Sequence, residues 1–153
     1  MLDFGAGGLR DSKYLLSKGF HVTALDKEFH EDFPYSGLQF QRITSTFEEV
    51  YFPHDSFDVI IAHNSLPFIK KEDFERVWEN LYKWLTPEGT LIVNFFGENH
   101  GWNGTMITHS IEEISQLLQK YTVQHLQEKD EDSETVSDGI VRWHSISVIA
   151  QKI

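Results

Sequence analysis

The chain opens with a short apolar run that gives way to glycines and then to a second apolar run. Residues 2–4 read Leu-Asp-Phe, and a Gly-Ala-Gly-Gly segment follows at residues 5–8. Apolar positions over residues 10–18 then favour a helix that a glycine stops, and residues 20–25 form a second strand-like run closed by Asp26. This order predicts a strand, a glycine turn, a helix and a second strand.

The middle of the chain predicts three more strands and one clear helix. Residues 38–43 alternate between polar and apolar, which is typical of a strand near a sheet edge. Residues 57–62 are so apolar that we expect them beside the first strand, buried on both faces of a parallel sheet. Residues 73–85 have the spacing of an amphipathic helix, residues 86–89 end it, and residues 90–96 form the next strand.

The end of the chain predicts a helix and two strands. A capping box opens a helix over residues 110–121, and strands follow at residues 122–128 and 140–151. The acidic stretch 129–139 between them is predicted to be a solvated hairpin loop, so these two strands should pair antiparallel. Earlier, residues 27–37 are polar and broken by a proline, so the helix expected there is short or absent.

These elements predict the fold class α/β: a Rossmann-like seven-stranded sheet, mostly parallel, with an antiparallel last strand and helices on both faces. The chain has 153 residues, which is enough for a single domain over 1–153 but too short for an added substrate domain.

Charge and composition exclude several functions. With 24 acidic and 13 basic residues the net charge is −11, so we expect no nucleic-acid partner. The chain has no cysteine and no histidine pair at i, i+4 spacing, so we expect no metal site. There is no long apolar run and no signal peptide, which predicts no membrane association and a cytoplasmic location.

The glycine turn and Asp26 carry the first chemical signal. Glycines let the backbone approach a ligand closely, and the helix that follows directs its free N–H groups to the same place. An acid at the tip of the next parallel strand can accept hydrogen bonds from ribose hydroxyls. This combination predicts a nucleoside cofactor, although Asp26 could instead be a solvated acid at the end of a strand.

The same segment resembles the first motif and second strand of class I S-adenosylmethionine-dependent methyltransferases. It is most similar to the small methyltransferases of the tellurite-resistance type. Further matches are residues 57–62 with the fourth-strand motif, residues 85–91 with the turn into the fifth strand, and residues 142–144 and 148–152 with the closing strand. The resemblance implies S-adenosylmethionine as cofactor and a small-molecule methyl acceptor, with the antiparallel ending favouring this family over nicotinamide-dependent oxidoreductases.

The resemblance also assigns candidate cofactor-binding residues. They are Asp3, Gly5, Ala6, Gly7, Asp26, Lys27, Thr44, Ser45, Thr46, Phe47 and His63. Asp3 either caps the turn or holds the amino group of the cofactor's methionine portion. At residues 44–47 relatives often carry an aspartate that binds adenine; here a hydroxyl could replace it and Phe47 could stack on the ring, or Ser45 or Thr46 could cap a helix.

The catalytic candidates are His63, Asn64 and His144. His63 and Asn64 follow the fourth strand at the sheet edge where ligands bind, and their alternative role is to cap the strand end. His144 lies in the segment that matches the closing strand, where at most one of it and its neighbour Trp143 should reach a ligand. In the loop after the fifth strand, His100, Trp102 and His109 could shape the acceptor site or form an irregular surface loop.

Departures from the family pattern leave a second function open. The chain begins inside the first strand, without the N-terminal helical segment that the family packs over the cofactor, and Leu9 stands where a third glycine is common. Either the chain is truncated, or another subunit supplies the lid, or the protein no longer catalyses efficiently. The alternative to an enzyme is therefore a non-catalytic, methyltransferase-like protein that binds the cofactor or a partner chain, and a homodimer is compatible with both.

Overall fold

The structure is a computed structural model that describes residues 1–29 and 37–153. Its elements, in chain order, are β1 (Leu2–Phe4), α1 (Arg10–Ser17), β2 (Val22–Asp26), β3 (Phe40–Thr44), β4 (Phe57–Ala62), η1 (Leu66–Phe68), η2 (Lys71–Asp73), α2 (Phe74–Trp84), β5 (Leu85–Phe96), α3 (Ile111–Leu117), β6 (Tyr121–Thr135) and β7 (Gly139–Lys152). Most of the segment 27–37, where a short or absent helix was predicted, lies outside the described residues.

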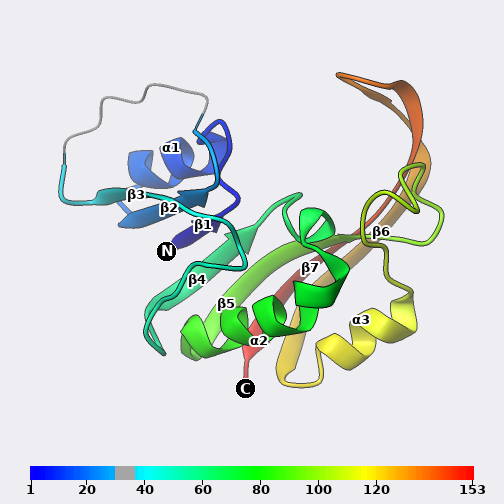
Figure 1. The fold of residues 1–153 in the computed structure, drawn as a ribbon. Coiled ribbons are helices and arrows are strands. Elements are labelled where there is room, and N and C mark those ends of the chain that lie inside the picture. The colour runs from blue at the N-terminus through cyan, green and yellow to red at the C-terminus, as the bar shows by residue number, and fades with distance from the viewer. Residues whose placement is uncertain (30–36) are drawn as a thin grey trace.

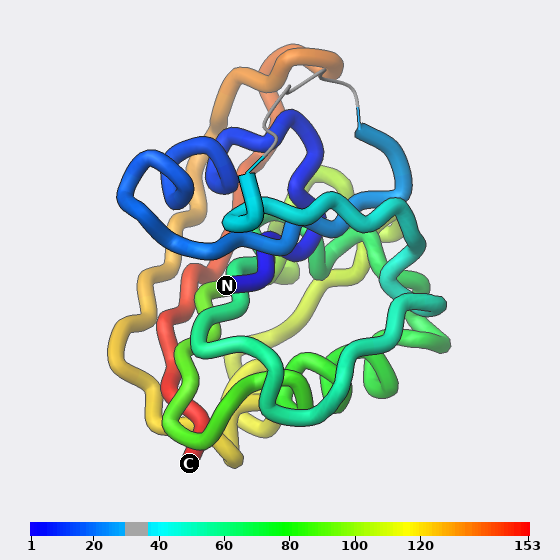
Figure 2. Tube along the Cα trace, turned by 90° about the vertical axis from the view of Figure 1, so that its left-hand side faces the viewer, coloured from blue at the N-terminus to red at the C-terminus, as the bar shows by residue number. Residues whose placement is uncertain are grey.

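Seven strands form one sheet in the order β3-β2-β1-β4-β5-β7-β6, with α1 on one face and α2 and α3 on the other (Figure 1 and Figure 2). Strands β1 to β5 pair in parallel, whereas β7 runs antiparallel to both β5 and β6. This arrangement confirms the predicted fold class. The strand order reverses between β1 and β4, and that reversal point is where open α/β sheets bind their ligands.

The main core lies between the sheet and α2. Five side chains of α2 are buried at helical spacing: Phe74, Val77, Trp78, Leu81 and Trp84. Trp84 packs edge-on against the Phe52 ring at a centroid distance of 5.0 Å. Burying an aromatic side chain of this size stabilises the fold by about 2–3 kcal/mol, so α2 fixes the sheet from which the strand ends project.

The opposite face of β4 is less covered than the sequence predicts. Ile61 is only partly buried, and so are its cross-strand neighbours Ile92 and Ile149, which lie in register with it. The expectation of burial on both faces is therefore wrong for this strand. Among the described residues, α1 is the helix on that side, and it packs on β2 rather than on β4.

The acidic stretch 129–139 corrects the predicted hairpin loop. Residues 129–135 continue β6 and pair with residues 139–145 of β7, so the turn is confined to residues 136–138. Arg142 Nε donates to Asp130 Oδ1 at 2.7 Å across the two strands. The prediction failed because both faces of this hairpin are largely exposed, so its charged strands lack the apolar alternation that marks a half-buried strand.

Two element boundaries also differ from prediction. β5 begins at Leu85 instead of residue 90, because the expected turn is a bulge within the strand, with Glu88 in the left-handed region at φ 63°. α3 ends at Leu117, earlier than predicted, although its capping box at Ser110 and Glu113 is present as expected.

Candidate functional site

The turn after β1 requires glycine. Gly5 has φ +82°, and a Cβ added there would lie 2.2 Å from the Ser65 Oγ and 3.2 Å from the Phe47 ring. The N–H groups of Gly5 and Ala6 both donate to the Leu25 carbonyl, at 2.8 and 2.9 Å. The end of β1 therefore lies directly against the chain that leaves β4, and only a residue without a side chain fits between them.

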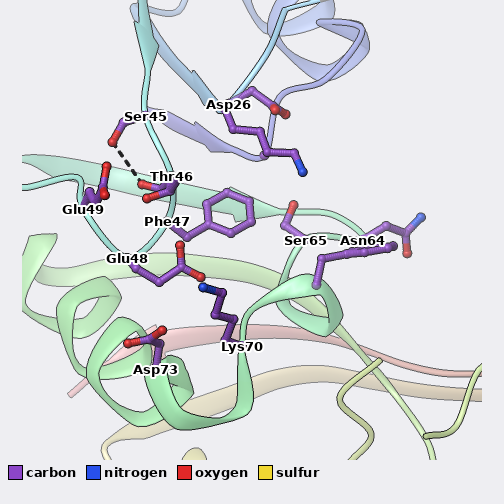
Figure 3. A pocket seen from close by; sticks show the side chains of 13 residues that line it. Asp26, Ser45, Thr46, Phe47, Glu48, Glu49, Asn64, Ser65, Lys70 and Asp73 are labelled. Atoms are coloured by element: carbon purple, nitrogen blue, oxygen red, sulfur yellow. Dashed lines mark hydrogen bonds between the residues drawn. The ribbon is translucent and has the colours of Figure 1, made fainter. Parts of the chain in front are cut away.

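Asp26 holds this turn from the end of β2. Its Oδ2 accepts the N–H of Gly7 at 2.8 Å, and its Oδ1 accepts the N–H of Glu28 at 3.2 Å. Asp26 is also one of the residues that line the cavity above the strand ends (Figure 3). The acid predicted to bind ribose thus lies at the cavity, and each of its oxygens accepts one backbone N–H.

Asp3 lies beneath the turn and does not line the cavity. Its side chain is buried, at 3% exposure, and its Oδ2 accepts the Ser12 hydroxyl at 2.6 Å. Burial raises the pKa of Asp3 to about 6, an effect that the Ser12 hydrogen bond partly opposes. In this position the carboxyl ties β1 to α1.

The segment that leaves β3 forms one wall of the cavity. Ser45, Thr46 and Phe47 line it, whereas Thr44 is exposed at the strand end. Phe47 stacks on Phe4 with a centroid distance of 4.2 Å. The helix-capping alternative for this segment is wrong, because residues 47–49 form a turn and no helix begins there. The Thr46 Oγ1 is buried without a hydrogen-bond partner among residues 1–29 and 37–153, so this wall holds an unsatisfied polar atom within the described structure.

The segment that leaves β4 forms the opposite wall and is fixed by a residue that sequence reasoning missed. Asn64 adopts φ +51°, and its N–H donates to the Asn94 Oδ1 at 2.6 Å while the Asn94 Nδ2 donates to the Asn64 Oδ1 at 2.6 Å. Next to it, the Ser65 Oγ donates to the Phe4 carbonyl at 2.7 Å. The available signal for Asn94 was an amide inside the apolar run of β5, where a buried polar side chain requires partners.

The side chain of His63 lies outside this cavity. It is 60% exposed, and its Nδ1 is 3.7 Å from the Asp11 Oδ2 on α1. It lines a separate, largely apolar hollow on the α1 side of the sheet, together with Tyr14, Ile61 and Ile92. The structure therefore separates His63 from Asn64, although the two are neighbours in sequence.

His144 is buried and both of its ring nitrogens are engaged. Its Nδ1 accepts the N–H of Asn99 at 3.0 Å, so the ring proton is assigned to Nε2, which lies 2.7 Å from the Glu128 Oε1. A Cβ at Gly97 would lie 2.2 Å from the His144 ring, so the loop after β5 packs directly on it. In this arrangement His144 anchors that loop.

The aromatic residues of that loop pack on one another rather than into the cavity. His100 is 2% exposed and stacks on Phe96 at 3.7 Å, and Trp102 and Trp143 surround it. The His100 Nε2 is buried and has no hydrogen-bond partner in the part of the chain that the structure describes. His109 packs against α2 instead, and its burial lowers its pKa. The buried His100 thus anchors a loop of turns that is otherwise largely exposed.

The cavity itself has a volume of about 450 Å³ and lies over the carboxyl ends of β1 to β4. It is lined by Gly5, Asp26, Lys27, Ser45, Thr46, Phe47, Glu48, Glu49, Asn64, Ser65, Phe68, Lys70 and Asp73. A volume of this size is typical of small-molecule and cofactor sites. Sequence reasoning missed the outer part of this lining, from Glu48 and Glu49 on one side to Lys70 and Asp73 on the other.

Comparisons with known proteins agree with this geometry. A family model described as a methyltransferase domain matches residues 2–93. A search of curated proteins found no match. The described part of the chain has no helix that is long and apolar enough to cross a membrane.

Solved structures share the fold at low sequence identity. A S-adenosylmethionine-dependent methyltransferase from Methanosarcina mazei has a TM-score of 0.77 and 18% identity, over 99% of this chain and 91% of that one. The Burkholderia thailandensis 1,6-didemethyltoxoflavin-N1-methyltransferase, solved with 1,6-didemethyltoxoflavin and S-adenosylhomocysteine, has a TM-score of 0.75 and 20% identity, over 99% and 69%. A methyltransferase from Mesorhizobium loti has a TM-score of 0.71 and 11% identity, over 99% and 89%.

Proposed function

Because the chain belongs to the methyltransferase-domain family, we propose that it transfers a methyl group to a small-molecule acceptor, with residues 1–153 acting as one domain. S-adenosylmethionine is the cofactor that the family and its solved structural neighbours indicate. The observation that carries the proposal is the cavity at the reversal of strand order, where the glycine turn of β1 meets the carboxyl end of β4. The finer resemblance, to methyltransferases of the tellurite-resistance type, stays a prediction.

The residues of the cavity fit a nucleoside cofactor. Asp26 would accept the ribose hydroxyls, because it is part of the cavity lining and its carboxylate is already oriented by the Gly7 N–H. The unpartnered Thr46 Oγ1 lies in the wall assigned to adenine, where Phe47 supplies an apolar face. Lys27 lines the same region. The glycine turn at Gly5 would allow the close backbone approach that the methionine portion needs.

Methyl transfer makes few chemical demands on the protein. When bound, S-adenosylmethionine supplies an electrophilic methyl group: the acceptor's lone pair forms the new bond to carbon, and the pair of the broken carbon–sulfur bond stays on sulfur. The chain's own residues then position the acceptor and exclude water. Of the three catalytic candidates, Asn64 lines the cavity. His144 would act indirectly, by holding the loop after β5. His63 lies on the α1 side of the sheet, so it could contact an acceptor only from that side.

Calorimetric titration with S-adenosylmethionine and S-adenosylhomocysteine tests this function. We expect micromolar binding that Asp26→Ala abolishes. Asp26→Asn keeps an oxygen for the Gly7 N–H but loses an acceptor, so it should bind more weakly than the unaltered chain and more tightly than Asp26→Ala. Asp138→Ala removes an exposed carboxylate from the β6–β7 turn and serves as the control for lost charge.

The outcomes separate the two functions that the sequence leaves open. Binding followed by turnover on any member of a panel of small-molecule acceptors supports the enzyme. Binding without turnover on that panel favours the non-catalytic, cofactor-binding alternative. If neither ligand binds, or if Asp26→Ala binds as tightly as the unaltered chain, the proposed cofactor site is wrong.

A further inference from the structure

A second cavity adjoins the first and shares two of its residues. It has a volume of about 470 Å³ and lies between the segment that follows β4 and the loop that follows β5. Phe68 and Lys70 line both cavities. Because the two cavities share this wall, a molecule seated in the second can reach the mouth of the first.

The charge of the second cavity is opposite to that of the chain. The chain has a net charge of −11, yet the lining of this cavity contains two lysines and no carboxylate: Pro67, Phe68, Ile69, Lys70, Lys71, Asn103, Gly104, Thr105, Met106, Ile107 and Thr108. By contrast, the first cavity has four carboxylates in its lining. An anion is therefore favoured in the second cavity and disfavoured around it.

Both lysines are available to a ligand. Lys70 and Lys71 are exposed, and neither makes an ion pair or a side-chain hydrogen bond with any residue in the described ranges 1–29 and 37–153. The nearby Asp73 carboxylate is instead bound to Arg76 at 2.7 Å. Figure 3 shows Lys70 extending from the segment after η1 toward Glu48 of the first cavity, with which it forms no ion pair. An unpaired ammonium on a flexible stem is a suitable donor for a carboxylate or phosphate oxygen.

The walls of this cavity are fixed to each other. The Ile107 N–H donates to the Pro67 carbonyl at 3.0 Å, which joins the loop after β5 to η1. Within the loop, the Thr105 hydroxyl donates to the Trp102 carbonyl at 2.8 Å, and the Asn103 Nδ2 donates to the Glu98 carbonyl at 2.9 Å. The Thr105 hydroxyl and one Asn103 N–H are thus engaged, and the two lysines are the cationic side chains of the cavity lining.

We propose that the methyl acceptor carries an anionic group, a carboxylate or a phosphate, which Lys70 and Lys71 bind in the second cavity while its nucleophile points across Phe68 toward the first. This inference rests on the proposed function. The net negative charge of the whole chain does not by itself indicate such a substrate class. Phe68, 48% exposed, offers an apolar surface to the body of such a molecule.

Amide NMR titration with inorganic phosphate and with acetate tests the anion site, on the free chain and in the presence of S-adenosylhomocysteine. We expect shifts at residues 69–71 and 103–108, with millimolar affinity that weakens as salt is added. Lys71→Gln should weaken binding severalfold, and Lys70→Gln/Lys71→Gln roughly tenfold or more. The control Lys18→Gln/Lys83→Gln removes the same charge elsewhere and should leave the affinity within about twofold.

Comparing phosphate with acetate distinguishes a phosphorylated acceptor from a carboxylate acceptor. Comparing anion binding with cofactor binding separates the anion site from the proposed function. Stronger binding of phosphate points to a phosphorylated acceptor, and equal or stronger binding of acetate points to a carboxylate. Because Lys71 is not part of the lining of the first cavity, Lys71→Gln should leave the affinity for S-adenosylhomocysteine unchanged. If the anions shift no amide of the second cavity, or if the double variant and its control behave alike, the anion site is wrong; loss of cofactor binding alone contradicts only the proposed function.

Discussion

Replacing Asp3 by asparagine should change how the stability of the protein depends on pH. The carboxyl is buried at 3% exposure, and burial raises its pKa to about 6 from an ordinary value of 3.8. A carboxyl whose pKa is raised by folding contributes its full stability below its unfolded pKa and loses that stability as the pH rises through its folded pKa. The window for Asp3 therefore runs from about pH 4 to about pH 6.

The size of the effect follows from the same two pKa values. Each pKa unit corresponds to about 1.4 kcal/mol, so ionising Asp3 costs the folded state about 2.5 kcal/mol between pH 4 and pH 8. Asparagine is neutral throughout, and its Oδ1 can still accept the Ser12 hydroxyl. Asp3→Asn should therefore gain about 2.5 kcal/mol relative to the unaltered chain when the pH is raised from 4 to 8.

Urea unfolding followed by tryptophan fluorescence at both pH values measures this difference. The control is Asp138→Asn, which alters an exposed carboxyl in the β6–β7 turn and should show the same free-energy difference at pH 4 and pH 8. The prediction concerns the change between the two pH values, so any cost of burying the amide cancels. If the relative stability of Asp3→Asn changes by less than about 0.5 kcal/mol across this range, the carboxyl ionises without penalty and the reasoning fails.

Three further substitutions test the local geometry. Gly5→Ala should destabilise the chain by about 3 kcal/mol or more and abolish S-adenosylhomocysteine binding, whereas Gly19→Ala, which has a similar φ of +88° but no atom near its Cβ, should cost only about 1 kcal/mol in urea unfolding. Tyr121→Phe should leave stability unchanged or raise it by up to about 1 kcal/mol, because its buried hydroxyl has no hydrogen-bond partner among the described residues; a clear loss in thermal unfolding would contradict this. Asn94→Ala should lose about 1–3 kcal/mol and weaken S-adenosylhomocysteine binding in calorimetry, because the backbone N–H after β4 loses its acceptor.

The parts of the fold that the sequence predicts well are those where one physical requirement dominates. The glycine turn, α2 and the central strand β4 were all predicted, because a tight turn needs glycine and a buried face needs apolar spacing. The charged half of the β6–β7 hairpin was not predicted. Its two strands are held together by backbone hydrogen bonds and ion pairs, so their sequence does not alternate between apolar and polar residues. The prediction therefore failed in a strand whose side chains are exposed on both faces, because such a strand needs no apolar residues.

The candidate site shows the same division. Asp26 could be found because it ends the strand that follows the glycine turn and the first helix. Since β2 pairs in parallel with β1, its end lies beside the glycine turn. Lys70 and Asp73 could not be found in this way. They follow β4 in a segment of short 3₁₀ turns, and the sequence of such a segment has no apolar periodicity from which its path could be predicted. His63 shows the converse error: the strand end was located correctly, but adjacent residues there point to opposite faces of the sheet.

The contacts around Asn64 and Ser65 explain why the candidate site depends on strands from both sides of the reversal point. Ser65 donates to the carbonyl at the end of β1 and fills the space left by Gly5, while Asn64 is held in its left-handed conformation by an amide of β5. A shift of β5 would therefore move the wall of the first cavity through Asn64. Since β5 also leads into the loop that lines the second cavity, the positions of the proposed cofactor and acceptor sites are set by the same strand.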